Sequence, residues 1–511
     1  MTFQSILFKG SENFIKKETL REPDYFVDLN LNQLIDFVTT GKDEYNLKPF
    51  FYTPLNDIAA ITYRHEIMQD IENITVYQKI ISFADKMRTM REQRARILKL
   101  YYKHQKERWF LEVVNIYCNA TEQLMHDLSS EIKSQGLLLF RDYLINYVQS
   151  DRFKLLYSKA KRILNELASV QYCIHFRDLR VQVRSLNSES NYSEEIDATF
   201  QKFKHEPVKD YRAVYPFDPM NMNHVEAQIL DGVVHLYPDI FQNLESFFAE
   251  NQDYLDETIA LFDREIQFYI AYHDYIEPLK NTGLKFCYPQ VTKESKEIYC
   301  YEGYDLALAH KLINEKLPVV VNDFHLKKEE RIIVVSGPNQ GGKTTCARTF
   351  GQLHYLAGIG CPVPGRKAQL FIFDKLFTHF EKEENIKNLR GKLQDDLVRI
   401  HKILNQASSD SIMVLNEIFT STALQDQVFL SKNIMERIIE LDSLCIWVTF
   451  IDELASYSKK TVSMVSTVVP DNPAMRTFKI LRGPANGLAY ALSIAEKYSL
   501  TYNSLKERLK L

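Results

Sequence analysis

The sequence predicts an α/β domain in the second half of the chain, preceded by a mainly α-helical domain that contains a small β insertion. Two observations predict this division. Between Pro54 and Pro207 the chain has no proline and only one glycine, Gly136, and these are the residues that usually end helices. From Cys287 onward, short apolar runs alternate with helical stretches, a rhythm typical of a mainly parallel sheet.

Within the first half, residues 151–170 place Phe153, Leu156 and Leu167 close to helical spacing, which predicts long packed helices. Alternation over residues 171–187 predicts the small β element, and a second helical block follows over residues 223–281.

The expected domains follow from these patterns. We expect an N-terminal segment over residues 1–45, a helical domain over residues 46–285 with an insertion near residues 171–205, and the α/β domain over residues 286–511.

Composition indicates an ordinary globular protein, with 45% hydrophobic and 25% charged residues among 511. The formal charge of −4 is small for this length, so a polyanionic partner would need a local basic patch. The seven cysteines form no C-x-x-C pair, which argues against a disulfide framework and a zinc site. No secretory leader and no long uncharged apolar run are found, so we expect a cytoplasmic protein without a membrane partner.

The most specific motif is Gly337-Pro-Asn-Gln-Gly-Gly-Lys343-Thr344, which satisfies G-x-x-x-x-G-K-[ST]. It follows an apolar run at residues 332–335 and opens a helix candidate, the setting in which such a loop binds the phosphates of ATP. A glycine-rich turn without a ligand is the plainer alternative. The expected nucleotide-binding residues are Gly337, Pro338, Asn339, Gln340, Gly341, Gly342, Lys343, Thr344 and Thr345.

A second apolar strand, residues 412–415, ends in Asn416 and Glu417. Lys343 and Glu417 are the expected catalytic residues, the first neutralising phosphate charge and the second positioning the attacking water. We expect Thr344 to ligate Mg²⁺ and Asn416 to reach the metal through water. Asn416 carries no negative charge, so metal affinity should fall. A solvated carboxylate at a strand end is the alternative for Glu417.

Residues 85–109 gather basic side chains and tyrosines along one helical stretch. Such a face could follow DNA phosphates, although a basic stretch is more often simply a solvated helix surface. The candidates for DNA contact are Arg88, Arg91, Arg94 and Lys99.

With these motifs in place, residues 285–511 resemble the ATPase domain of the MutS family of DNA mismatch-repair proteins, which belongs with the ABC-type ATPases. GPNQGGKTT is similar to the family's GPNMGGKST, and LNEIFTSTALQD is similar to MDEIGRGTSTYD, which aligns Asp426 with the family's aspartate after the metal strand. The stretches at residues 377–404 and 486–509 also resemble family segments.

The resemblance implies a fold and partners for the rest of the chain. The helices would be the family's core and lever arms, and the β element near residues 172–183 would lie where the family inserts its DNA clamp. About 45 residues precede the core, so the family's mismatch-recognition domain is expected to be missing. The working unit implied is a homodimer.

Three residues depart from the family's pattern. Asn416 replaces the metal-strand aspartate, Gly391 stands in place of the serine that caps the γ-phosphate across the dimer, and Phe450 replaces a histidine. Each change removes a polar contact, which implies slow or altered turnover. Two hypotheses remain: an ATP-switched clamp on double-stranded or branched DNA, and a nucleotide-binding interaction protein with little hydrolysis.

Overall fold

The computed structural model describes residues 3–10, 18–128, 131–178, 180–186, 192–201, 220–381, 391–469, 472–485 and 498–509. The chain forms two compact units, described separately below. One unit contains Met1–Ile74, Ile132–Leu139 and Arg264–Leu511, and the other contains Thr75–Glu131 and Phe140–Asp263. The domain boundary expected at residue 285 falls inside the first of these, which we call the sheet unit; the second is the helical unit.

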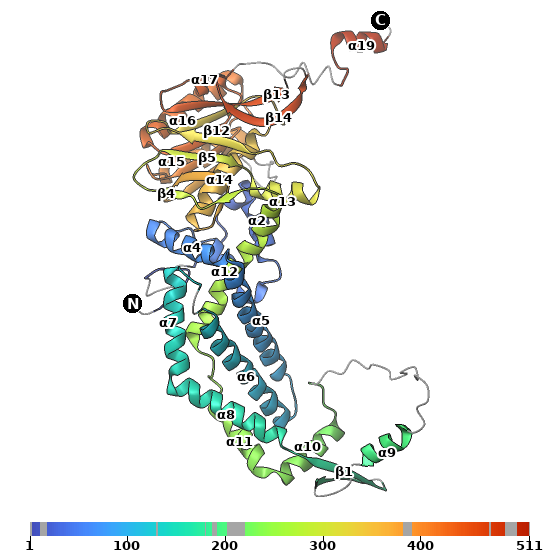
Figure 1. Cartoon of the computed structure of the whole chain (residues 1–511). Helices are drawn as coiled ribbons and strands as arrows, with labels where there is room; N and C mark the ends of the chain where they lie inside the picture. The colour runs from blue at the N-terminus through green and yellow to red at the C-terminus, as the bar shows by residue number, and fades with distance from the viewer. Residues whose placement is uncertain are drawn as a thin grey trace. The chain divides into compact units, whose positions relative to one another are not determined.

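Long helices build the helical unit, as the sequence predicts (Figure 1). Within it, α6 packs against α8 and α11, and Phe110 of α6 contacts the rings of Phe247, Phe248 and Tyr254. The helices are α5 (Ile74–Ile97), α6 (Lys103–Asp127), α7 (Gln135–Gln149), α8 (Asp151–Ala168), α9 (Tyr192–Gln201), α10 (His224–Leu236), α11 (Pro238–Glu250) and α12 (Glu257–Asn281), with α7 and α12 shared between the units.

The small β element is an antiparallel hairpin of β1 (Tyr172–Arg177) and β2 (Arg180–Ser185). It packs on α10, where a Cβ added to Gly232 would lie 2.9 Å from a methyl carbon of Val183. A glycine is therefore needed on that face of α10, because a side chain would push the hairpin away.

The sheet unit is built on a six-stranded sheet of order β10-β11-β12-β7-β13-β14, in which only β14 is antiparallel to its neighbour. The mainly parallel α/β sheet predicted from the sequence is thus present. Its strands are β7 (Ile332–Ser336), β10 (Leu376–Phe380), β11 (Ile412–Asn416), β12 (Leu444–Val448), β13 (Thr461–Val469) and β14 (Asn472–Arg482).

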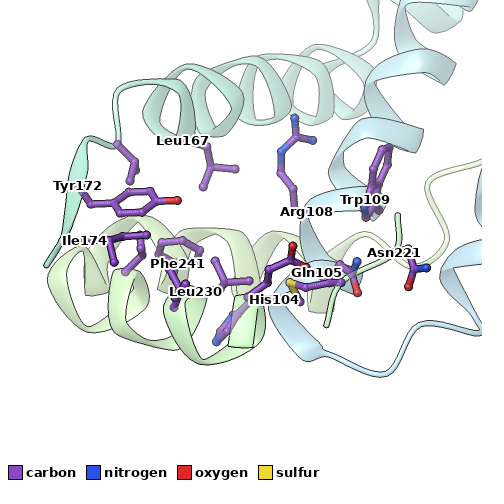
Figure 2. Close-up of a pocket in the computed structure, with 15 residues that line it drawn as sticks. His104, Gln105, Arg108, Trp109, Leu167, Tyr172, Ile174, Asn221, Leu230 and Phe241 are labelled. Carbon is purple, nitrogen blue, oxygen red and sulfur yellow. The ribbon is translucent and has the colours of Figure 1, made fainter. Parts of the chain in front are cut away.

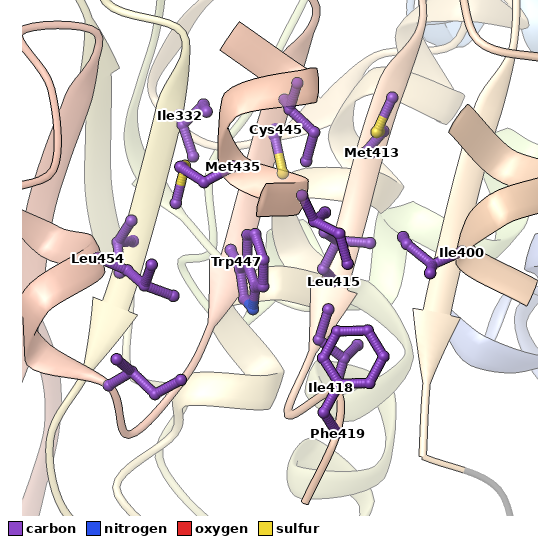
Figure 3. Packing of buried hydrophobic residues seen from close by; sticks show 14 of the residues in the cluster. Ile332, Ile400, Met413, Leu415, Ile418, Phe419, Met435, Cys445, Trp447 and Leu454 are labelled. Carbon is purple, nitrogen blue, oxygen red and sulfur yellow. The ribbon is translucent and has the colours of Figure 1, made fainter. Parts of the chain in front are cut away.

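Helices cover both faces of this sheet. Because alternate residues of a strand face opposite sides, one set of buried side chains packs against α15 (Lys392–Gln406), α16 (Leu424–Leu441) and α17 (Asp452–Ala455). On the other face, α14 (Lys343–Gly358) contacts β11 and β12. Figure 3 shows the first layer, which includes Ile332, Ile400, Met413, Leu415, Met435, Cys445, Trp447 and Leu454.

A smaller sheet of order β4-β9-β5-β6 contacts the opposite side of α14 through β9. The sequence patterns do not separate this sheet from the larger one. The remaining elements are α1 (Tyr25–Asp28), α2 (Leu31–Thr39), η1 (Asp43–Tyr45), α3 (Lys48–Phe51), α4 (Ile58–Ile71), β3 (Phe286–Cys287), β4 (Gln290–Thr292), β5 (Ile298–Gly303), α13 (Leu306–Asn314), β6 (Asn322–Leu326), β8 (Val363–Pro364), β9 (Lys367–Phe371) and α19 (Tyr502–Leu509). Among the helices that the structure describes, none is long and apolar enough to cross a membrane.

Glu265 of α12 is a buried carboxyl that holds the N-terminal segment in the sheet unit. Its Oε1 accepts a hydrogen bond from the Ser5 hydroxyl at 2.6 Å, and its Oε2 accepts one from the Ile6 N–H at 2.9 Å. Burial raises the pKa of Glu265 to about 7. The two hydrogen bonds and the charge of the Arg64 guanidinium act in the opposite direction and lower this pKa, but burial has the larger effect. Folding is therefore linked to proton uptake at this residue.

We expect Glu265→Gln to flatten the pH dependence of the unfolding free energy. The unfolded chain releases this proton near pH 4.5, whereas the folded chain holds it to about pH 7. The contribution of Glu265 to stability therefore falls as pH rises between these values, by about 3 kcal/mol. Glutamine keeps the length of the side chain and is uncharged at every pH, so the variant loses the titration at this position.

Urea unfolding of the wild type and Glu265→Gln at pH 5 and pH 8 measures this difference. The variant should gain stability relative to the wild type as pH rises. Glu315→Gln, at an exposed position, is the matched control and should leave the slope unchanged. Parallel curves for the wild type and Glu265→Gln would contradict the prediction.

Candidate nucleotide-binding site

Side chains from separate strands meet at one edge of the six-stranded sheet. Val335 of β7 pairs with Val448 of β12, Val448 pairs with Asn416 of β11, and Asn416 pairs with Phe380 of β10. These residues lie at or next to the carboxyl ends of parallel strands, so the segments that follow leave the sheet at the same edge. This is where open α/β sheets form binding crevices.

The segment from Gly337 to Gly342 joins β7 to α14 in the order that the motif predicts. Gly337, Gln340 and Gly342 have positive φ angles of 116°, 59° and 88°. Gly342 is the N-cap residue of α14, so the first N–H groups of the helix have no helical acceptor. Such a helix end attracts a phosphate through these N–H groups and the helix dipole.

A contact with β13 explains why the loop needs two of its glycines. The Ser466 hydroxyl donates to the Gly341 carbonyl at 2.6 Å. A Cβ on Gly341 would lie only 2.2 Å from the Ser466 hydroxyl oxygen. A Cβ on Gly337 would lie 2.9 Å from the Ser466 carbonyl oxygen. Arg476 of β14 donates through Nε to the Asn339 carbonyl at 3.1 Å. The sequence reasoning did not identify Ser466 and Arg476, because neither forms part of a local motif.

Lys343 is a buried cation surrounded by the loop. Its ammonium donates to the Gly337 carbonyl at 3.0 Å, to the Pro338 carbonyl at 3.2 Å and to Asn339 Oδ1 at 3.3 Å. Burial lowers the pKa of Lys343, whereas the charge of nearby Glu417 raises it. An ammonium so desolvated is stabilised by a negative group entering the loop.

Glu417 directly follows β11 and lies in the same site. Its Oε1 is 3.8 Å from Lys343 Nζ, and its backbone N–H donates to the Val448 carbonyl at 2.9 Å. Its φ angle is 51°, so the chain turns sharply at this residue. Burial raises the pKa of Glu417, while Lys343 lowers it and Glu381 raises it further. The sequence reasoning did not identify Glu381, which follows β10.

Thr344 and Asn416 meet as the two expected metal-associated residues. The Thr344 hydroxyl donates to Asn416 Oδ1 at 3.0 Å. Both groups can offer oxygen to a hard cation, but neither carries charge. No cluster of three His, Cys, Asp or Glu side chains that could hold a metal is found among the described residues. The pair therefore fits Mg²⁺ that arrives with nucleotide phosphates and keeps several waters, rather than an ion held by protein alone.

The three departures from the family pattern have distinct surroundings. The Phe450 ring is 4.2 Å from Lys343 Nζ, so it gives the ammonium a cation–π contact where a polar group was expected. Gly391 is the N-cap residue of α15, and a Cβ there would meet no atom of the described residues within 4 Å. Those residues therefore leave room for a serine at position 391. Asp426, in the first turn of α16, accepts from the Thr422 hydroxyl at 3.5 Å.

The expected DNA-contact residues lie in or just after α5 of the helical unit. Arg88 pairs with Asp85 at 2.8 Å, Arg91 pairs with Asp263, and the Arg94 guanidinium lies 5.9 Å from the Tyr254 ring centre. Lys99 is exposed in the turn after α5. Arg91 already has a buried carboxylate partner, so it is the least available of the four for phosphate.

Comparison with known proteins agrees with this arrangement. Residues 333–506 match the family MutS domain V. The chain is 28% identical over 217 residues to "DNA mismatch repair protein MutS" of Orientia tsutsugamushi, covering 41% of this chain and 24% of that protein. It is 30% identical over 197 residues to "Endonuclease MutS2" of Thermomicrobium roseum, covering 38% and 25% respectively.

A longer match reaches into the preceding region. The chain is 24% identical over 335 residues to "Endonuclease MutS2" of Staphylococcus aureus, covering 65% of this chain and 41% of that protein. The matched stretches thus span between a quarter and two fifths of these relatives.

Proposed function

We propose, since the chain belongs to the MutS family through its domain V, that it is an ATP-dependent DNA-binding protein. It works as a dimeric clamp that recognises DNA structure rather than mispaired bases, in the cytoplasm and without a membrane partner. The observation that carries the proposal is the meeting of Lys343, Thr344, Asn416 and Glu417 at one sheet edge.

Each residue has a role in handling ATP. The loop N–H groups and Lys343 would bind the phosphates, and Thr344 and Asn416, which are hydrogen-bonded to each other, would hold Mg²⁺, directly or through water. Glu417 positions the attacking water and accepts its proton. When bound, Mg²⁺–ATP would supply the γ-phosphoryl group, which is transferred to water with ADP as the leaving group. Ser466 and Arg476 hold the loop in shape from the β13–β14 hairpin.

The DNA-binding part of the proposal is supported by the basic surface of the helical unit. Arg94, Arg96 and Lys99 are exposed, and no acidic residue occurs between positions 93 and 106. Such a surface binds phosphates without reading sequence. Recognition of a branched or joint structure would then come from the spacing of two such surfaces in a homodimer.

A nucleotide-binding interaction protein with little hydrolysis is the second candidate. It is favoured by the uncharged Thr344–Asn416 pair and by the Phe450 ring against Lys343, since neither helps the metal or the attacking water. In this case ATP would stabilise a dimer, and the partner would be another macromolecule.

ATP turnover and DNA binding of the full chain separate these functions. We expect turnover to change on adding a four-way DNA junction, and molar mass from light scattering to double with Mg²⁺–ATP. Junction affinity should fall with rising salt, as expected when several phosphates are contacted. The clamp proposal is overturned if the junction neither binds nor alters turnover. ATP-dependent dimers without measurable hydrolysis would establish the second candidate instead.

A further inference from the structure

Strand β14 contacts the nucleotide-binding loop at two points. Arg476 donates through Nε to the Asn339 carbonyl at 3.1 Å. The Phe478 carbonyl oxygen lies 3.8 Å from the place that a Cβ on Gly342 would occupy. Because Gly342 is the N-cap residue of α14, β14 runs beside the loop from Asn339 to the start of this helix. A side chain on this part of β14 can therefore contact a group that is bound in the loop.

A bulge in β14 determines where Arg476 lies. Ser466 pairs with Ile480, and Val468 pairs with Arg476, so three residues of β14 lie opposite a single residue of β13. Phe478, in the middle of these three residues, has a φ angle of 58°, which is unusual for a bulky side chain. Bulges of this kind change the direction of neighbouring side chains and are frequent beside active sites.

Asn322 of β6 fixes the bulge in place. Its Nδ2 donates to the Phe478 carbonyl at 3.1 Å, and its Oδ1 accepts from the Ile480 N–H at 2.8 Å. A strained backbone conformation persists only where surrounding contacts determine it. The Asn322 amide supplies two such contacts, one on the strained residue and one just after the bulge. Arg476 is therefore carried by a segment that is held firmly beside the loop.

The charges around the loop favour an added phosphate. Burial lowers the pKa of Lys343, the charge of Glu417 raises this pKa, and the positive charge of Arg476 lowers it. Two cations thus act at the same place, and Glu417, 3.8 Å from Lys343 Nζ, opposes them. A triphosphate brings more negative charge than one carboxylate, so it can interact favourably with both cations. The guanidinium suits this contact, because its five N–H donors match the spacing of phosphate oxygens.

An arginine in a cavity of the helical unit has different surroundings. The cavity lies around Trp109 and has a volume of about 620 Å³ (Figure 2). Its Arg108 donates to Glu112 at 2.9 Å, and Glu226 also lines the cavity. These two carboxylates oppose the approach of a phosphate. We therefore place no phosphate in this cavity.

We propose that Arg476 contacts the γ-phosphate of bound ATP and so distinguishes ATP from ADP. In loops of this kind the backbone N–H groups hold the α- and β-phosphates, and the lysine extends to the β- and γ-phosphates. Arg476 acts on the charge of this lysine, so it lies toward the γ-phosphate end of the site. The inference rests on the proposed ATP binding and adds to it a residue that recognises the third phosphate.

Equilibrium binding to the full chain tests the inference with two ligands in the presence of Mg²⁺. The ligands are ADP and an ATP analogue whose β–γ bridge cannot be hydrolysed. We expect the wild type to bind the analogue more tightly than ADP. In Arg476→Gln, which removes the positive charge, this preference should fall by about tenfold, as expected for the loss of a hydrogen bond between charged groups.

Three further variants separate recognition of the phosphate from support of the loop. Ser466→Ala removes the hydroxyl that bonds to the Gly341 carbonyl, and it should weaken the binding of both ligands by the same factor. Lys479→Gln removes a positive charge at an exposed position of the same strand, and it should leave the preference unchanged. Arg476→Lys keeps the charge and should retain most of the preference.

The outcomes distinguish this inference from the proposed function. An equal loss of affinity for both ligands in Arg476→Gln, or no loss for either, overturns the γ-phosphate contact and leaves the proposed ATP binding standing. Equal affinities of the wild type for the two ligands have the same consequence and depend on no variant. A loss of preference in Arg476→Lys as large as that in Arg476→Gln also overturns the contact. If the wild type binds neither ligand, this inference and the proposed function both fail.

Discussion

Replacing Glu417 by glutamine is expected to lower ATP turnover by about 100- to 1,000-fold, the usual effect of losing a general base. Glutamine keeps the length of the side chain but cannot accept a proton from water. Nucleotide affinity should be maintained or rise, because Lys343 Nζ lies 3.8 Å from Glu417 Oε1 and would lose a partner that competes with phosphate. Turnover and binding therefore respond differently to this one substitution.

Steady-state phosphate release and equilibrium binding of a fluorescent ATP analogue measure the two quantities. Glu440→Gln is the control, because Glu440 is an exposed residue of α16 that pairs with Arg437 at 2.8 Å. This control should match the wild type in both assays. Retention of more than half of the turnover by Glu417→Gln would remove Glu417 from the chemical step.

Local patterns were sufficient to predict the elements that carry the site. The apolar run before Gly337 forms β7, the helix after it begins at Lys343, and Asn416 ends a buried strand. In a parallel sheet these ends share one edge, so the approach of Thr344 to Asn416 could be anticipated from the sequence. Alternation near residues 171–187 likewise predicted the hairpin of β1 and β2.

Contacts between distant segments could not be predicted in this way. Ser466 supports Gly341 from a strand 125 positions later, and Glu265 holds Ser5 across 260 positions. A polar residue on a strand gives no local sign of its partner. Phe450 was expected only as the loss of a polar contact, whereas the fold places its ring against the Lys343 ammonium. The cavity around Trp109 is lined from five elements and has no signature in any one of them.

Restoring a carboxylate by Asn416→Asp should lower the Mg²⁺ concentration for half-maximal ATP turnover by about tenfold or more, equivalent to at least 1.4 kcal/mol. The change places a negative charge 3.0 Å from the Thr344 hydroxyl, whose donated hydrogen bond a carboxylate still accepts. The new charge lies beside Glu417, so without Mg²⁺ it should also reduce stability. Asn314→Asp adds the same charge at an exposed position on α13 and should leave the Mg²⁺ requirement unchanged.

A magnesium titration of ATP turnover in both variants decides the role of Asn416. If ATP turnover is limited by the missing negative charge at position 416, the Asn416→Asp variant should need less Mg²⁺ and hydrolyse ATP faster, because the metal is held more firmly against the phosphates. If turnover is limited at Gly391 or Phe450 instead, the Mg²⁺ requirement falls and the maximal rate stays the same. An unchanged Mg²⁺ requirement would mean that residue 416 does not reach the metal's water shell. The neutral Thr344–Asn416 pair would then only support the loop.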